Sequence, residues 1–197
     1  MVDIDFLEAR LRDAVSSLPD GLRGHVLRVE AEARRLAELH NVDEHRSVVA
    51  ALGHDLVRHL NAGELLAAAT EYGHVVDPVE AQSPILVHGP VAARILSLDF
   101  GLEDTELLDG IDCHTTARAG MTALERVLFI ADKVEPHKLK REPSLGEVKD
   151  TAEEDLLAAT LLYLDYNLGQ SVKRGWLVHP RSLEARNELL TLRGLPA

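Results

Sequence analysis

Six side chains that can bind a metal ion occur in order along the chain, and two of them form an adjacent His-Asp pair. They are His25, His54, Asp55, His88, His114 and Asp132. Imidazole nitrogens and carboxylate oxygens together suit borderline divalent metals such as iron, manganese, zinc, cobalt and nickel. A metal bound in this way can keep one position open for water and convert that water into a nucleophile. The series predicts a metal-dependent phosphohydrolase.

Both aspartates interrupt an apolar pattern in the same way. Asp55 comes shortly after the apolar run 48–52, and Asp132 comes directly after the run 127–131. A carboxylate at the end of a buried run is costly unless it is paired or binds a cation. A metal between packed helices explains both positions, although Asp132 alone also fits an ion pair with a neighbouring basic residue such as Lys133.

The other candidates each have a simpler interpretation. His25 fits a half-buried helix residue, and His88 fits a turn residue in its Val-His-Gly-Pro setting. His54 with Asp55 fits a helix C-terminus, where the helix dipole favours a histidine. The single cysteine, Cys113, is expected to be a small core residue, because no basic residue near it in sequence is arranged to activate it.

Basic and hydroxyl side chains near these residues are candidates for binding phosphate. Thr115, Thr116 and Arg118 lie in one short segment. Two hydroxyls and a guanidinium beside a histidine can bind a phosphate, or they can form a solvated loop. Arg58 lies three residues after Asp55 and would share its face on a continuing helix, so it could neutralise a phosphate or pair with Asp55.

Amphipathic helices punctuated by Gly, Pro and Asp have to position these side chains. Apolar residues recur at three- and four-residue steps, and no segment shows the alternation of a strand. Helix caps are predicted at Asp43 and Asp104, and Thr122 with Glu125 looks like a capping box. Residues 135–151 are predicted as a loop with a short helix. Helices are predicted at residues 5–17, 22–40, 43–55, 62–72, 91–98, 104–114, 122–132, 152–174 and 181–193.

Length and composition favour one helical domain. The chain has 197 residues, of which 46% are hydrophobic and only 4% aromatic. Abundant Ala and Leu with few aromatic residues favour helix over strand. We predict an all-α, single-domain helical bundle over residues 1–197, with its core at about 20–190, the helix 5–17 packed on it and the metal site between helices.

Net charge and cysteine content restrict the partners and the location. Acidic residues outnumber basic ones by 33 to 21, which gives a formal net charge of −12. This balance argues against a nucleic-acid-binding surface, because such surfaces need clustered Lys and Arg. A single cysteine fits a reducing cytoplasm. No secretory signal and no run of about 18 apolar residues is present, so we expect a cytoplasmic protein that binds no membrane.

Several short segments spread over about residues 20–190 form an ordered pattern. They are 25–29 (HVLRV), 53–55 (GHD), 86–91 (LVHGPV), 114–116 (HTT), 121–125 (MTALE), 130–136 (IADKVEP), 177–180 (LVHP) and 184–187 (EARN). The ordered His, His-Asp and Asp resemble the HD superfamily of metal-dependent phosphohydrolases. The further segments resemble, more specifically, the YqeK family of symmetrical diadenosine tetraphosphate hydrolases.

The resemblance implies a metal site and a reaction. The metal ligands that it implies are His25, His54, Asp55 and Asp132. Iron is the ion that it implies. Water bound to this metal would attack phosphorus and cleave diadenosine tetraphosphate symmetrically into two ADP, and Asp55 would both bind the metal and orient the water.

The resemblance also implies how the phosphates of the nucleotide are held. His88 and His114 would lie beside the metal, on the phosphates or as ligands of a second ion. With Arg58 they would offset the charge that develops during the reaction. The phosphate-binding candidates are His88, His114, Thr115, Arg118 and Lys138.

Three positions depart from the pattern of that family. Arg58 stands where the family has Lys, Ala117 where it has Gly, and Lys138 where it has Arg. These positions are expected to face phosphate, where a planar guanidinium and a point-like ammonium are not equivalent. Two alternatives therefore remain: a phosphatase acting on mononucleotides or another phosphoester, and a sensor that binds metal and nucleotide with little turnover. The sequence also leaves open whether the protein forms a homodimer.

Overall fold

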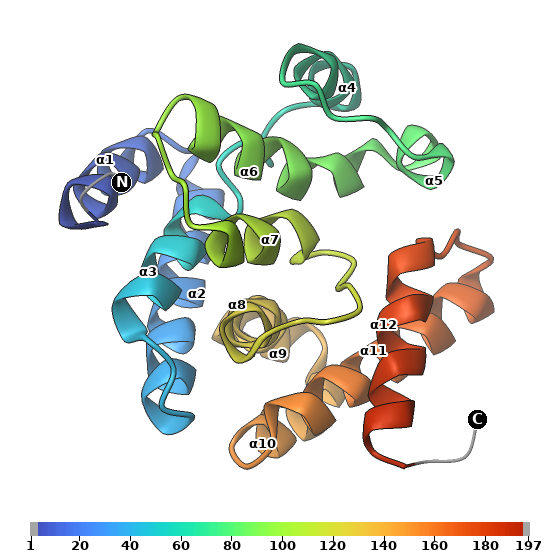
Figure 1. The fold of residues 1–197 in the computed structure, drawn as a ribbon. Helices are drawn as coiled ribbons and strands as arrows, with labels where there is room; N and C mark the ends of the chain where they lie inside the picture. The colour runs from blue at the N-terminus through green and yellow to red at the C-terminus, as the bar shows by residue number, and fades with distance from the viewer. Residues whose placement is uncertain (1–3, 195–197) are drawn as a thin grey trace.

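The computed structural model describes residues 4–194, which form helices joined by short loops and contain no strand (Figure 1). This arrangement confirms the predicted all-α class. No helix in this part of the chain is long and apolar enough to cross a membrane. Short 3-10 turns cover Pro84–Val87 and Pro143–Leu145. The α-helices are α1 (Ile4–Ser16), α2 (Asp20–Leu39), α3 (Glu44–Gly53), α4 (Ala62–Glu71), α5 (Pro78–Gln82), α6 (His88–Leu98), α7 (Thr105–Cys113), α8 (Ala123–Val134), α9 (Pro136–Arg141), α10 (Gly146–Ala152), α11 (Leu156–Arg174) and α12 (Pro180–Leu192).

Three predicted helix starts carry the expected caps. Asp43 and Asp104 accept hydrogen bonds from backbone N–H groups in the first turns of α3 and α7. Thr122 likewise accepts a hydrogen bond from the backbone N–H of Glu125 at the start of α8. The second half of the predicted capping box does not form, because Arg118 binds the carboxylate of Glu125.

Two segments are more helical than predicted. Residues 78–82 form α5, which starts with a reciprocal capping box between Asp77 and Glu80, a pattern that is visible in the sequence. The predicted loop at 135–151 contains both α9 and α10. The helix expected from residue 152 begins later, because Asp155 caps the start of α11.

The core is centred on α8, which Figure 1 shows end-on, with α2 and α3 on one side, α7 above it and α11 below it. The α8 segment 127–131 is fully buried, so Asp132 at its end also enters the interior. Helix α2 packs against α3 and α8, and α7 packs against α6 and α8. The N-terminal helix α1 packs on α3. Five segments that are distant in sequence therefore meet around the C-terminal end of α8.

Gly89 allows α6 to approach the end of α7. A Cβ atom at this position would lie 2.8 Å from the carbonyl oxygens of both Ile111 and Asp112, closer than carbon and oxygen atoms can pack. The close approach brings His88, the first residue of α6, next to His114, which directly follows α7. A larger residue at position 89 would push these two histidines apart.

Candidate metal centre

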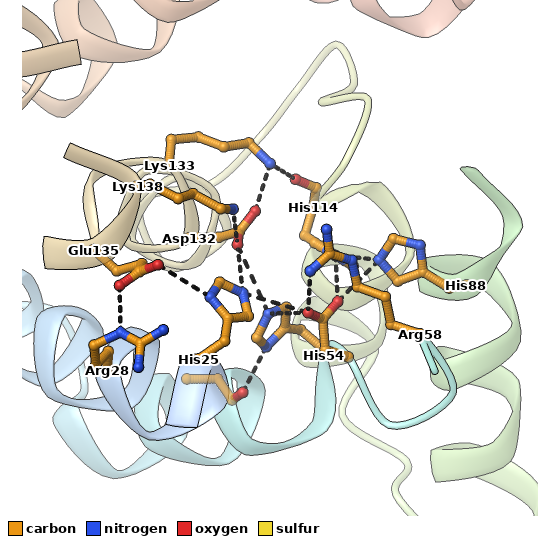
Figure 2. A network of polar contacts seen from close by, with 12 residues as sticks. His25, Arg28, His54, Arg58, His88, His114, Asp132, Lys133, Glu135 and Lys138 are labelled. Atoms are coloured by element: carbon orange, nitrogen blue, oxygen red, sulfur yellow. Dashed lines mark hydrogen bonds and ion pairs between the residues drawn. The ribbon is translucent and has the colours of Figure 1, made fainter. Parts of the chain in front are cut away.

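All six predicted metal-binding residues meet in one buried cluster between helices. The elements that supply them are α2, the end of α3, the start of α6, the end of α7 and the last turns of α8. In that order the residues are His25, His54 with Asp55, His88, His114 and Asp132. Figure 2 shows the labelled histidines and Asp132 gathered around a common centre.

Asp55 lies at the middle of the cluster and faces all four histidines. Its Oδ2 lies 3.4 Å from Nε2 of His25 and 3.4 Å from Nε2 of His54. Its Oδ1 lies 3.0 Å from Nε2 of His88 and 3.5 Å from Nε2 of His114. One carboxylate therefore joins two groups of candidate ligands, and within each group the ligand atoms lie within 4.8 Å of one another.

Asp132 completes the group that contains His25 and His54. Its Oδ1 lies 3.0 Å from Nε2 of His25 and 3.9 Å from Nε2 of His54. Two lysines bind the same carboxylate: Lys138 donates to Oδ1 at 2.5 Å, and Lys133 donates to Oδ2 at 2.6 Å. The ion pair with Lys133 that the sequence suggested is thus present, together with the contacts to the histidines.

Hydrogen bonds at Nδ1 fix the orientation of three imidazoles. His54 donates from Nδ1 to the carbonyl oxygen of Ala51 at 2.6 Å, and His114 donates to that of Ile111 at 2.7 Å. His88 donates from Nδ1 in the same way to the backbone carbonyl oxygen of the residue three positions before it. Because a carbonyl oxygen can only accept, the proton of each neutral ring is on Nδ1, and the lone pair is on Nε2, facing the central carboxylate.

Two of the histidine nitrogens are buried near carboxylate oxygens, where a cation would be stabilised. Nε2 of His25 and Nε2 of His54 are buried and have no hydrogen-bond partner among residues 4–194. Each lies near carboxylate oxygens, and this electron-rich arrangement is unfavourable unless a proton or a cation lies between the groups. The donor set therefore fits a divalent metal ion bound by these histidines together with Asp55 and Asp132.

The charge states of Asp55, Asp132 and His114 are those that metal binding needs. Burial tends to raise the pKa of Asp55, but the nearby imidazoles outweigh it and hold this pKa well below its usual value. Burial likewise tends to raise the pKa of Asp132, but the positive charges of Lys133 and Lys138 outweigh it and hold this pKa well below its usual value. Burial also lowers the pKa of His114 to about 3. Near neutral pH both carboxylates are ionised and His114 is neutral, as ligands must be.

Besides His88 and His114, two predicted phosphate-binding residues contact the cluster, and a third directly follows one of its histidines in sequence. Arg58 lies beside it, with Nη1 3.3 Å from Oδ2 of Asp55. Lys138 reaches the cluster through Asp132. The hydroxyl of Thr115, which directly follows the last cluster histidine in sequence, is buried and has no hydrogen-bond partner in the described part of the chain.

Arg118 is not brought to the cluster. Its guanidinium binds the carboxylates of Glu125 and Asp109 instead. The preceding residue, Ala117, has a φ of 60°, in the left-handed region that favours glycine. The departure from Gly at this position therefore places an alanine in a conformation that costs about 1–2 kcal/mol.

A pocket of about 610 Å³ opens beside the cluster, with His25 on its wall. Arg28 and Glu135 also line the pocket, and the sequence analysis did not single them out as site residues. Arg28 lies three residues after His25 on α2, a spacing that places both on one helix face. The basic residues that line the pocket are Arg28, Arg58, His59, His137, Lys138 and Arg141.

The comparisons with known proteins agree on one family. Residues 22–137 match the family model of the HD domain. A protein of Staphylococcus aureus (strain NCTC 8325 / PS 47) named symmetrical bis(5'-nucleosyl)-tetraphosphatase is 34% identical over 146 residues, which is 74% of this chain and 74% of that relative. A protein of the same name from Bacillus subtilis (strain 168) is 31% identical over 170 residues, which is 85% of this chain and 88% of that relative.

A solved structure supports the same family. A predicted HD superfamily hydrolase involved in NAD metabolism, from Clostridium acetobutylicum, matches this fold with a TM-score of 0.86 and 28% identity over 98% of this chain and 99% of its own. The residues that match the HD domain include the whole cluster from His25 to Asp132. The chain therefore belongs to the HD domain family of hydrolases and, within it, to the family of the symmetrical bis(5'-nucleosyl)-tetraphosphatases.

Proposed function

We propose that this protein hydrolyses diadenosine tetraphosphate symmetrically to two ADP with a bound divalent metal, and that the metal is iron. The observation that carries the proposal is the buried, unpartnered Nε2 atoms of His25 and His54, which face two ionised carboxylates beside a basic pocket. The names of the two relatives supply the substrate class.

The metal would be held by His25, His54, Asp55 and Asp132. A divalent ion at this position supplies positive charge that polarises a phosphoryl group and lowers the pKa of water to near neutrality. Mixed imidazole and carboxylate ligands suit iron, and they also suit manganese, cobalt, nickel and zinc. His88 and His114 share Asp55 with these ligands, so they are placed to hold a second ion or to contact phosphate.

The side chains around the cluster bind the substrate and orient the reactants. Arg58 and Lys138 present positive charge at the pocket, where they bind phosphoryl oxygens and offset the charge that develops as the bond breaks. Asp55 accepts a hydrogen bond from the attacking water, and the unpartnered hydroxyl of Thr115 donates to the phosphates. Hydrolysis of the central anhydride joins the water oxygen to one central phosphorus and leaves the bridging oxygen on the other, so both products are ADP.

The proposal includes a cytoplasmic location. Cys113 is free and buried, and a free thiol fits a reducing compartment.

Product analysis tests the proposed reaction. Anaerobically purified protein is incubated with diadenosine tetraphosphate and ferrous iron, and the nucleotides are separated by anion-exchange chromatography beside a chelated control. We expect ADP as the sole product, lost on chelation and restored by iron. Formation of AMP with ATP would contradict symmetrical cleavage. Dephosphorylation of mononucleotides alone would favour the phosphatase, and nucleotide binding without turnover would favour the sensor.

A further inference from the structure

The pocket beside the metal centre contains basic side chains that pair with no carboxylate among residues 4–194. Arg141 on α9, His137 on the same helix and His59 after α3 all line it. Their side chains make no hydrogen bond or ion pair with any residue in the range 4–194. By contrast, Arg28 and Arg58 in the same pocket both pair with carboxylates. In a chain with a net charge of −12, unpaired basic residues gathered in a pocket indicate a site for an anion.

Exposure orders the basic residues from the floor of the pocket to its rim. The side chain of His25 is 8% exposed, that of Lys138 25% and that of Arg58 39%. Arg141, His59 and His137 are exposed. Figure 2 shows Lys138 and Arg58 beside the cluster, and Arg141 at the exposed rim of the pocket adds a further positive charge. The basic lining therefore runs from the buried cluster to side chains that are open to solvent.

We infer that Arg141, together with His59 and His137, forms a second anion subsite at the rim, which binds the phosphates of the nucleotide half that lies away from the metal. This inference rests on the proposed function and extends it. A tetraphosphate attacked at a central phosphorus has two phosphates on each side of the breaking bond. The attacked half meets Lys138 and Arg58, and the leaving half extends toward the rim. A guanidinium suits this position because it binds two phosphate oxygens at once.

The subsite selects substrates by length. A mononucleotide with its phosphate at the metal centre does not extend to the rim, so it gains no contact with Arg141. The contact to a dinucleotide is the same before and during bond cleavage. Loss of Arg141 therefore raises the KM for diadenosine tetraphosphate and leaves kcat unchanged.

The test compares Arg141→Gln with Lys140→Gln. The control removes the same charge from the neighbouring exposed position of α9, which does not line the pocket. Isothermal titration calorimetry measures the binding of inorganic tetraphosphate to the metal-free protein. We expect Arg141→Gln to weaken this binding about tenfold, as the loss of one charge-assisted contact does. We expect Lys140→Gln to change it less than about twofold, because an exposed charge outside the site is screened. In the iron-loaded protein, we expect Arg141→Gln to raise the KM for diadenosine tetraphosphate more than Lys140→Gln does.

Two outcomes overturn the subsite: equal tetraphosphate binding by the two variants, or no tetraphosphate binding by the unsubstituted protein. Failure of the proposed function looks different. If tetraphosphate binds through Arg141 but diadenosine tetraphosphate is not cleaved, the anion subsite stands and the substrate assignment fails. If cleavage occurs and both variants bind tetraphosphate equally, the substrate assignment stands and the subsite fails.

Discussion

Nε of Arg28 donates a 2.6 Å hydrogen bond to Oε2 of Glu135, whose other oxygen lies 3.4 Å from Nδ1 of His25. The carboxylate thus holds the Nδ1 proton of His25, as backbone carbonyls hold those of the other three cluster histidines, and directs Nε2 toward the metal centre. Arg28 and Glu135 also line the pocket. The same ion pair therefore forms part of the pocket wall and sets the orientation of a candidate ligand.

Glu135→Gln should weaken metal binding about 10–100-fold, the usual effect of losing the partner that orients a ligating histidine. The amide keeps the shape of the side chain but loses the charge that holds both His25 and Arg28. Competition with a chromophoric chelator measures the affinity, and far-UV circular dichroism checks that the variant is folded. Unchanged affinity in a folded variant would remove Glu135 from the metal centre.

Metal removal should lower the melting temperature. A ligand that binds only the folded state stabilises it by about 2.7 kcal/mol at a concentration of 100 times its Kd, which corresponds to about 5–10 °C for a protein of this size. Calorimetric scans of the chelated protein, before and after iron is restored, measure the shift. Identical melting curves in both states would count against a metal site.

Asp132→Asn should reduce hydrolysis to the level of the chelated protein while most of the helix content is kept. The amide oxygen can still accept a hydrogen bond from one of the two lysines that bind Asp132, but its NH2 group cannot accept from the other, and the ionised ligand is gone. Asp109→Asn, at an exposed carboxylate that pairs with Arg118, is the matched control and should keep full activity. Hydrolysis at the unsubstituted rate by Asp132→Asn would refute the ligand assignment.

Gly89→Ala should destabilise the fold by about 1–3 kcal/mol, the cost of overpacking a close contact, because the added methyl group meets two backbone carbonyls that cannot move independently. Gly146→Ala is the control, since a Cβ at that position meets no atom within 4 Å and should leave the stability unchanged or slightly raised. Urea denaturation compares the two variants. Equal midpoints would show that α6 can shift away from α7 at no cost.

The residues that meet in the buried cluster could be singled out from the sequence as candidate metal ligands, because their chemistry conflicts with their surroundings. Asp55 and Asp132 follow apolar runs, and the structure buries both. The helix starts at Asp43 and Asp104 were predictable for a related reason, since a cap forms within one turn of chain. Signals of this kind are local, so one sequence is enough to detect them.

The contacts that the sequence could not supply are those between distant segments. Arg28 and Glu135 are 107 residues apart, and neither has a local feature that points to the other. Arg118 shows the same limit, because a guanidinium beside a histidine suits a phosphate or a carboxylate equally well. The structure pairs Arg118 with Glu125, a contact that one sequence does not reveal.

The cluster residues come from five elements, and the contact between His25 and Glu135 joins positions 110 residues apart. A contact between residues this far apart in sequence forms late in folding, because the chain must first pay the entropic cost of closing the long loop between them. An ion therefore meets its ligands together only in the native arrangement, so it slows unfolding and leaves the refolding rate unchanged. Metal starvation would then shorten the lifetime of this protein, because proteases act on the unfolded chain, in addition to stopping the proposed reaction.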